Sequence, residues 1–288
     1  MRPKKILCLF TAAVLAFMGG CAKKQQKTQL SEVADGTTVY CFQAGKADAH
    51  LIYNNESAVL IDCGEKGFGK HIKAYMDEHG IDKLDYLIIT HFDKDHVGGA
   101  AKVMREFEIG KVLQSNSPKE SEEYTEYTEQ LAANNLEPVT VRERMSFSVG
   151  GMDITVDPPV QERYEIDESN NSSLITEITI GEKSMLFAAD AQDDRLAEYT
   201  SANEKKYDFL KVPYHGRYQK NLQAFIKDVE PSLAVITSSE EEPEDSEALI
   251  MLQKAGADVF LTRTAPVIVR CDGQKIAAGY DEQAEVQK

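Results

Sequence analysis

The most informative segment of this 288-residue chain reads Thr90-His91-Phe92-Asp93-Lys94-Asp95-His96-Val97-Gly98-Gly99. Four of its side chains can bind a metal ion: His91, Asp93, Asp95 and His96. The apolar run 84–89 precedes it and predicts a buried strand, so these side chains stand where a strand ends. Ligands bind at such strand ends in open α/β sheets. The alternative is a polar loop in which Asp95 only caps the next helix, but a cap needs just one such residue.

Two later positions also follow apolar runs. Asp190 comes after the run 185–189, and His215 comes after the run 209–214 and precedes a glycine. Alone, each would be an ordinary turn or cap residue. Together with the segment 90–99 they provide enough strand-end ligands for two metal ions. Imidazole and carboxylate together suit zinc, manganese or iron better than calcium or magnesium.

The pattern of elements predicts two sheets. Short strands at 37–42, 50–53 and 58–61 indicate a β-meander, and alternating helices and strands follow it. The second half, from about residue 147 on, repeats this order of elements without repeating the sequence. Strand-rich meanders followed by alternating helices and strands, twice over, favour two sheets packed face to face with helices outside. A single doubly wound sheet would not account for the meanders.

The chain resembles the metallo-β-lactamase superfamily. More closely, it is similar to the β-lactamase-like domain of ComEC-type DNA-uptake proteins. The segments that carry the resemblance occur in the family's order: 41–49, 59–64, 90–99, 170–174, 187–191 and 210–216. The resemblance implies an α/β fold, a four-layer αββα metallo-β-lactamase sandwich, over residues 37–280. It also implies a metal site at one edge, between the two sheets.

The resemblance further implies roles for individual residues. The first metal would bind His91 and Asp93, the second would bind Asp95, His96 and His215, Asp190 would bridge the two, and Asp62 would orient a ligand. Asn170 stands where many members of the superfamily have another histidine. Two divalent ions, zinc or alternatively manganese, would activate a water molecule for attack. Asp95 would also orient the resulting hydroxide, and Asn170 or Tyr214 would donate a hydrogen bond to the developing oxyanion.

Three departures from the family pattern concern the substrate. Tyr214 takes the first position of a His-His-Gly segment, the acidic run 240–245 replaces a Gly-His-Pro stretch, and Arg263 replaces an acidic residue. An acidic run repels nucleic-acid phosphates. It is most simply a solvated loop, although at the rim of the site it would favour a cationic group such as choline.

The N-terminus predicts export. Residues 1–20 combine a positive start with an apolar core too short to span a membrane, and Met18-Gly19-Gly20-Cys21 resembles a lipoprotein processing site. Lipid would be attached to Cys21, residues 21–36 would be a flexible tether, and 281–288 a polar tail. An ordinary secretory signal is the alternative. Removing the three positive charges of residues 1–20 changes the formal net charge from −16 to −19, which disfavours nonspecific binding to nucleic acid.

Other chemically active side chains are expected to be structural. Cys41, Cys63 and Cys271 are predicted to be buried free thiols, with zinc binding by Cys63 as a lesser alternative. His50, His71 and His79 have no ligand partners nearby in the sequence. Tyr124 and Tyr127 belong to an acidic helix at about 120–134, which is expected to be a solvated face rather than a substrate lid.

These observations predict a surface-anchored, metal-dependent hydrolase. We expect it to act on phosphodiesters in nucleotides, nucleic acid or cell-envelope polymers. The alternative, from a different class, is a lipoprotein that keeps the fold for binding and has no turnover. A β-lactamase proper is disfavoured, because Asp93 and the later segments resemble those of phosphodiesterase-like relatives.

Overall fold

A computed structural model describes residues 28–284 of the chain. The expected export signal, the lipid-attachment residue Cys21 and the first part of the expected tether lie outside the described residues. Within the described part, residues 28–36 lie against the domain rather than apart from it. Val33 is buried, and the backbone N–H of Ala34 donates to Asp272 Oδ2 at 3.2 Å. The described residues form no helix long and apolar enough to cross a membrane.

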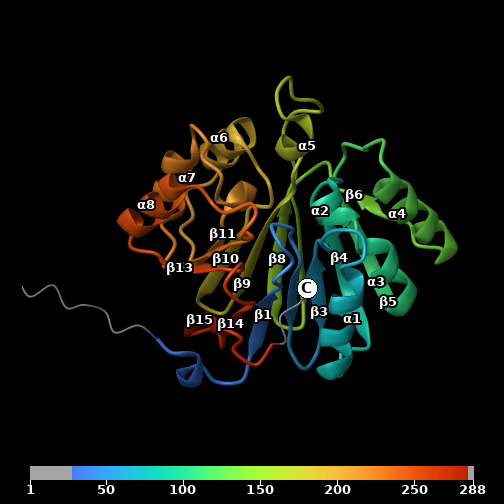
Figure 1. The fold of residues 1–288 in the computed structure, drawn as a ribbon, viewed down its shortest axis with the longest axis horizontal. Coiled ribbons are helices and arrows are strands. Elements are labelled where there is room, and N and C mark those ends of the chain that lie inside the picture. Colours follow the sequence, from blue (N-terminus) through green and yellow to red (C-terminus); the bar gives the residue numbers. More distant parts are fainter. Residues whose placement is uncertain (1–27, 285–288) are drawn as a thin grey trace, which may run out of the picture.

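Two mixed sheets pack face to face (Figure 1). The first sheet has the order β15-β14-β1-β2-β3-β4-β5-β6. Its strands are β1 (Thr37–Cys41), β2 (His50–Tyr53), β3 (Ala58–Ile61), β4 (Lys83–Ile89), β5 (Glu108–Gln114), β6 (Val139–Thr140), β14 (Val267–Cys271) and β15 (Ile276–Tyr280). The second sheet has the order β13-β12-β11-β10-β9-β8-β7. Its strands are β7 (Met145–Val149), β8 (Met152–Asp157), β9 (Ile175–Ile180), β10 (Lys183–Phe187), β11 (Phe209–Lys211), β12 (Leu233–Ile236) and β13 (Asp258–Leu261).

Helices cover the outer face of each sheet (Figure 1). The first sheet is covered by α1 (Gly69–Glu78), α3 (Ala100–Glu106) and α4 (Glu122–Ala133). The second sheet is covered by α6 (Asp193–Ala202), α7 (Leu222–Val229) and α8 (Ser246–Ala255). The short elements are η1 (Leu30–Glu32), α2 (Lys94–Val97), α5 (Glu168–Asn171) and η2 (Pro213–Gly216). The predicted four-layer αββα sandwich is confirmed.

Three apolar clusters hold the layers together. One lies between the first sheet and its helices, one between the sheets, and one between the second sheet and its helices. Ile61 and Val269 of the first sheet meet Ile154 and Phe187 of the second in the middle cluster. Each fully buried side chain of this kind stabilises the fold by about 1.5–3 kcal/mol. The middle cluster fixes the two sheets against each other and so brings their strand ends together.

The Gly-Gly turn of the segment 90–99 separates α2 from α3. Both glycines pack against the turn that follows β3. A Cβ atom on Gly99 would collide with the carbonyl oxygen of Cys63, and one on Gly98 would collide with the backbone N of Lys66. The two glycines are therefore needed because two backbone segments approach closely there.

The tyrosines of α4 differ from expectation. Tyr127 is fully buried and its hydroxyl donates to Gln114 Oε1 at 2.7 Å. Tyr124 is half-buried, with its ring 4.6 Å from that of Phe92. The prediction of a solvated face was wrong for these two residues. They lie on the side of α4 that packs beneath the metal-binding segment.

Candidate metal centre

The candidate ligands all follow the ends of strands. Strands β3 and β4 are parallel, and so are β10, β11 and β12, so their carboxyl ends lie at the same edge of the sandwich. His91, Asp93, Asp95 and His96 follow β4, Asp190 follows β10, and His215 follows β11. Among these candidates, two groups have ligand atoms within 4.8 Å of one another: Asp95 with His96 and His215, and His91 with His96 and Asp190. A third group of this kind joins His96 to Asp48 and Asp62. Tertiary structure thus unites the segment 90–99 with residues about a hundred positions away.

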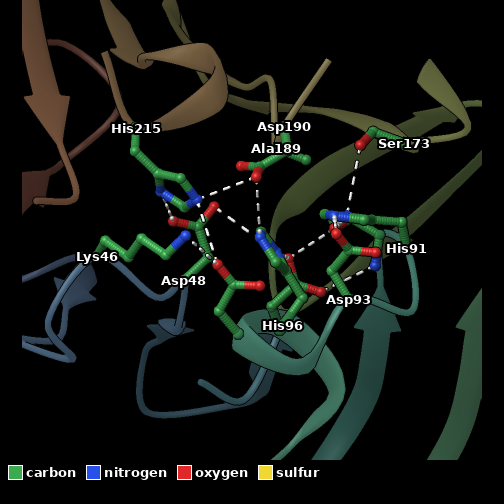
Figure 2. Close-up of polar contacts among 12 residues, drawn as sticks. Lys46, Asp48, His91, Asp93, His96, Ser173, Ala189, Asp190 and His215 are labelled. Atoms are coloured by element: carbon green, nitrogen blue, oxygen red, sulfur yellow. Dashed lines mark hydrogen bonds and ion pairs between the residues drawn. The ribbon is translucent and has the colours of Figure 1, made fainter. Parts of the chain in front are cut away.

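Each histidine presents Nε2 to the centre of this cluster (Figure 2). His96 Nδ1 lies 2.8 Å from Asp62 Oδ2, and His215 Nδ1 lies 3.0 Å from Thr237 Oγ1. His91 Nδ1 lies 3.2 Å from Thr90 Oγ1. Among the described residues, the Nε2 atoms of all three rings and Asp190 Oδ1 are buried and find no well-formed hydrogen bond. Such atoms cost about 1–3 kcal/mol each when nothing satisfies them. Their convergence fits a site for divalent metal ions.

Charge in the cluster is strongly coupled. Asp190 Oδ2 lies 3.0 Å from His215 Nε2 and 3.4 Å from His96 Nε2, as Figure 2 shows. Burial raises the pKa of the Asp190 carboxyl, but the two imidazoles outweigh it and hold that pKa well below its usual value. Burial likewise lowers the pKa of His96, but Asp190 and Asp62 outweigh it and raise that pKa well above its usual value. A metal ion binding here would therefore displace protons from the histidines.

Asp62 lies where the resemblance implied that it orients a ligand. Its Oδ1 accepts from the backbone N–H of Thr90 at 2.8 Å, and its Oδ2 accepts from Thr90 Oγ1 at 2.7 Å. The same Oδ2 accepts from Nδ1–H of His96. One buried carboxylate thus fixes both the start of the metal-binding segment and the orientation of the His96 ring.

Asp93 lies beside the cluster rather than within either group. Its Oδ2 is 4.0 Å from His91 Nε2, while its Oδ1 accepts from Lys119 Nζ at 2.5 Å and from the hydroxyl of Ser169. Asn170, one residue further on, has a buried Oδ1 without a hydrogen-bond partner in the described structure. Asp93 therefore lies next to the cluster, and its Oδ1 is already hydrogen-bonded to Lys119 and Ser169.

Tyr214 is half-buried, and its ring centroid lies 6.2 Å from that of His215. Within the described residues its hydroxyl makes no hydrogen bond to a candidate ligand. Its backbone N–H donates to the carbonyl oxygen of Ala189 at 3.1 Å. The oxyanion role expected for Tyr214 remains a prediction.

Strained backbone gathers at this edge. Asp62, Ala189, Tyr214 and His215 all have φ values between 47° and 56°, in the left-handed region that non-glycine residues rarely adopt. Such conformations cost of order 1–3 kcal/mol each and occur where the surrounding structure enforces them for function. Here they turn the chain sharply after β3, β10 and β11, so that the following side chains reach the cluster.

Sequence analysis missed four polar residues at the centre: Lys46, Asp48, Lys211 and Thr237. Lys211 is fully buried, although it stands in an otherwise apolar strand. A single lysine in an apolar strand does predict a buried ion pair, because a buried ammonium requires a charged partner. Lys46 and Asp48 lie in the loop between β1 and β2, whose position relative to the second sheet no local pattern predicts.

The acidic run and Arg263, two departures noted in the sequence, form one structural feature. The cationic partners of the run are Arg263 for Glu240 and Glu244, Lys46 for Glu242, and Arg217 for Asp245. Residues 240–243 are exposed, as expected of a solvated loop, whereas Glu244 is buried and most of the charge of the run is paired. Because Lys46 also lies 3.5 Å from Asp95 Oδ2, the run reaches the rim of the metal centre.

The remaining candidates are structural. Cys41, Cys63 and Cys271 are buried free thiols, as predicted. Burial raises the pKa of the Cys63 thiol well above its usual value, which disfavours the thiolate needed for zinc binding. In the described structure, His50, His71 and His79 belong to no group with metal-binding geometry. His79, for example, stacks on Tyr75 at 4.0 Å between ring centroids.

The fold and the metal centre together indicate a known class of protein. The family model described as the metallo-beta-lactamase superfamily matches residues 43–237. The chain belongs to the metallo-β-lactamase superfamily, whose members are typically metal-dependent hydrolases that bind divalent metals, often two zinc ions.

Curated relatives agree with the resemblance to ComEC-type competence proteins. The chain is 26% identical over 241 residues to ComE operon protein 3 of Bacillus subtilis, covering 79% of this chain and 30% of the relative. It is 23% identical over 204 residues to Recombination protein 2 of Haemophilus influenzae, covering 69% of this chain and 24% of the relative. The chain thus spans less than a third of the length of either relative.

Solved structures share the fold at low sequence identity. The metallo-beta-lactamase fold protein YhfI from Bacillus subtilis has a TM-score of 0.54 at 12% identity, covering 85% of this chain and all of that one. CmlA, a diiron beta-hydroxylase from Streptomyces venezuelae, has a TM-score of 0.51 at 17% identity, covering 78% of this chain and 52% of that one.

Proposed function

We propose that this protein is an exported metal-dependent hydrolase that acts on phosphodiesters. The observation that carries the proposal is the convergence of three buried Nε2 atoms with the carboxylates of Asp95 and Asp190. When bound there, two divalent ions would supply Lewis acidity and an activated water molecule at neutral pH. Zinc fits this ligand set best, with manganese as the alternative.

The chain's own residues supply the remaining requirements. Asp95 would orient the attacking water, and Asp62 holds the His96 ring. Lys46 and Lys119, each partly exposed, lie beside Asp95 and Asp93, so that the rim of the site carries positive charge within an acidic protein. A phosphodiester carries the negative charge that these two ammonium groups would bind.

The substrate and the location belong to the same proposal. Candidate substrates are extracellular nucleotides, nucleic acid and cell-envelope phosphodiesters. A lipid on Cys21 would anchor the protein to the membrane after export. The net charge of −16 argues against strong nonspecific binding to nucleic acid, so we propose recognition at the site rather than along a surface. The DNA-uptake setting of the relatives would require a partner protein.

Hydrolysis of bis-para-nitrophenyl phosphate by the purified, zinc-loaded full-length protein tests this function. We expect turnover that is lost in Asp95→Asn and kept in Asp77→Asn, an exposed aspartate on α1 that serves as the matched control. Turnover unchanged in Asp95→Asn, or a protein that binds no metal after reconstitution, would overturn the proposal. Faster hydrolysis of a chromogenic cephalosporin than of the phosphodiester would replace it with a β-lactamase.

A second candidate is a binding lipoprotein without turnover. Two points favour it: Asp93 is already paired with Lys119, and Asn170 stands where the resemblance implies a histidine in many members of the superfamily. In that case Asp95→Asn would leave ligand binding intact, and no phosphodiester would be cleaved by the metal-loaded wild-type protein.

A further inference from the structure

Lys211 is the most deeply buried charge near the metal centre that the proposed chemistry does not use. It stands at the end of β11 with no exposed surface. Its ammonium forms an ion pair with Asp48 and donates to the carbonyl oxygen of Ala189 at 2.9 Å. Asp190 Oδ1 lies 3.7 Å away. A buried ammonium is tolerated only when paired and hydrogen-bonded in this way.

Asp48 connects this ammonium to a ligand histidine. It comes from the loop between β1 and β2 of the first sheet, and its Oδ1 accepts from Thr237 Oγ1 at 2.6 Å. Thr237 follows β12 of the second sheet, and its Oγ1 also lies 3.0 Å from His215 Nδ1. The chain of contacts therefore runs from Lys211 through Asp48 and Thr237 to His215, and it crosses between the two sheets.

The direction of these hydrogen bonds follows from which groups can donate a hydrogen and which can only accept one. An ionised carboxylate can only accept, so the single hydroxyl hydrogen of Thr237 is donated to Asp48. The hydroxyl oxygen must then accept from His215, which requires that Nδ1 carry a hydrogen. With Nδ1 protonated, the Nε2 of neutral His215 has a free lone pair facing Asp190 and Asp95. That is the tautomer a metal ligand needs.

At the other end of this series of contacts, Lys211 acts on the turn that precedes Asp190. Lys211 holds the carbonyl of Ala189, a residue with φ of 47° directly before Asp190. One ammonium thus stabilises both the strained turn that presents Asp190 and the carboxylate that orients His215 through Thr237. These two are the candidate ligands supplied by the second sheet.

We propose that Lys211, Asp48 and Thr237 form a positioning unit that presets the His215 tautomer and the Asp190 turn for metal binding. The proposal rests on the metal centre described above, but its first consequence concerns the metal-free protein. His96 is oriented directly by a carboxylate, whereas His215 is oriented by a carboxylate acting through a hydroxyl. Lys211 and Thr237 of this unit belong to the second sheet, whereas Asp48 belongs to the first sheet and also meets the segment 90–99, because its backbone N–H donates to the carbonyl oxygen of Asp95 at 3.1 Å.

Thr237→Val tests the proposal, because it removes the hydroxyl and keeps the branched shape. In the metal-free protein, at a pH high enough to leave the ring neutral, nitrogen NMR of His215 should show the hydrogen on Nδ1 in wild type and a shift toward Nε2 in Thr237→Val. Zinc affinity, measured by competition with a chromogenic chelator, should fall about 10–100-fold, the usual loss for partners that orient a ligand. Thr237→Ser should restore both properties.

Thr176→Val is the matched control. Thr176 lies in β9 and, like Thr237, is fully buried, but its hydroxyl has no hydrogen-bond partner in the described structure. We expect its zinc affinity and the His215 tautomer to match wild type. The proposal is overturned if Thr237→Val retains the Nδ1 hydrogen on neutral His215, or if Thr237→Ser behaves like Thr237→Val.

The two readouts separate this proposal from the proposed function. If wild type binds zinc with the expected tautomer but cleaves no phosphodiester, the positioning unit stands and the function fails. If wild type is active while Thr237→Val keeps the tautomer, the function stands and the positioning unit fails. Lys211→Met is a poorer test, because it leaves Asp48 buried without its cation and can prevent folding.

Discussion

The two ends of the metal centre are built differently. The closed end consists of Asp95, His96 and His215 together with Asp190, and the open end consists of His91 and Asp93. At the closed end both rings are held by buried partners, Asp62 for one and Thr237 for the other. At the open end His91 has hydroxyl contacts of 3.2 and 3.4 Å, and Asp93 is shared with the partly exposed Lys119.

This difference indicates an order of metal affinity. Partners that orient a ligand typically change metal affinity by about 10–100-fold. The closed end has such partners on both of its histidines, whereas at the open end Asp93 is already paired with Lys119. We therefore expect the closed end to bind its metal ion first and more tightly.

Replacing a closed-end ligand should have the largest effect. In His215→Ala we expect zinc affinity at the closed end to fall by more than about 100-fold, beyond the loss caused by an orienting partner alone. Isothermal titration of the metal-free protein with zinc measures this. His71→Ala, on the outer helix α1, is the control and should titrate like wild type. An unchanged tight phase in His215→Ala would refute the assignment of the closed end.

Replacing the open-end histidine should be milder and selective. His91→Ala should weaken only the second, weaker phase of the same titration, by about 10–100-fold, because the closed-end ligands remain oriented. Elemental analysis at limiting zinc should still find one tightly held ion per chain. Loss of both phases would show that the two ends do not bind zinc independently, which would refute the proposed difference between them.

Rising pH should favour metal binding. Carboxylates raise the pKa of His96 and His215 above the usual value, despite burial, so the metal-free fold is stabilised by protonated imidazoles. That contribution is complete below the unfolded-state pKa of about 6.5 and is lost as pH rises through the higher folded-state values. Zinc competes with those protons, so its affinity should rise by about tenfold per pH unit for each proton displaced.

Melting curves with and without zinc at several pH values above about 6.5 would measure this. We expect the Tm of the metal-free protein to fall with rising pH and the gap to the zinc-loaded protein to widen. A gap that does not change with pH would mean that the histidines are already neutral in the metal-free protein.

Freeing Asp93 should produce the smallest change. Lys119→Met removes an ion pair at a side chain that is 42% exposed, and such pairs contribute about 0.2–1 kcal/mol. Zinc affinity at the open end should therefore rise by at most about fivefold, with the closed end unchanged. Lys73→Met, which removes the ion pair with Asp77 on α1, is the control. A loss of affinity in Lys119→Met would show instead that Lys119 positions Asp93 as a ligand.

Much of the fold and many of the candidate ligands could be predicted from local sequence patterns. The apolar run before residue 90, and those before Asp190 and His215, marked strand ends, and parallel strand ends share an edge of a sheet. By contrast, helix periodicity showed that Tyr124 and Tyr127 belong to one helix but not that they face the core. The acidic run looked solvated because its cationic partners, Arg263 and Lys46, are distant in the sequence.

Sequence alone determined the superfamily, the four-layer sandwich and the residues able to bind metal, because these depend on residue types in local order along the chain. Only the tertiary structure decided which nitrogen each histidine presents and which end of the centre is better supported. Those properties depend on contacts such as that between Thr237 and Asp48, which are 189 positions apart and meet across the two sheets. No local pattern encodes such a contact, because it exists only once the middle apolar cluster has fixed the sheets against each other.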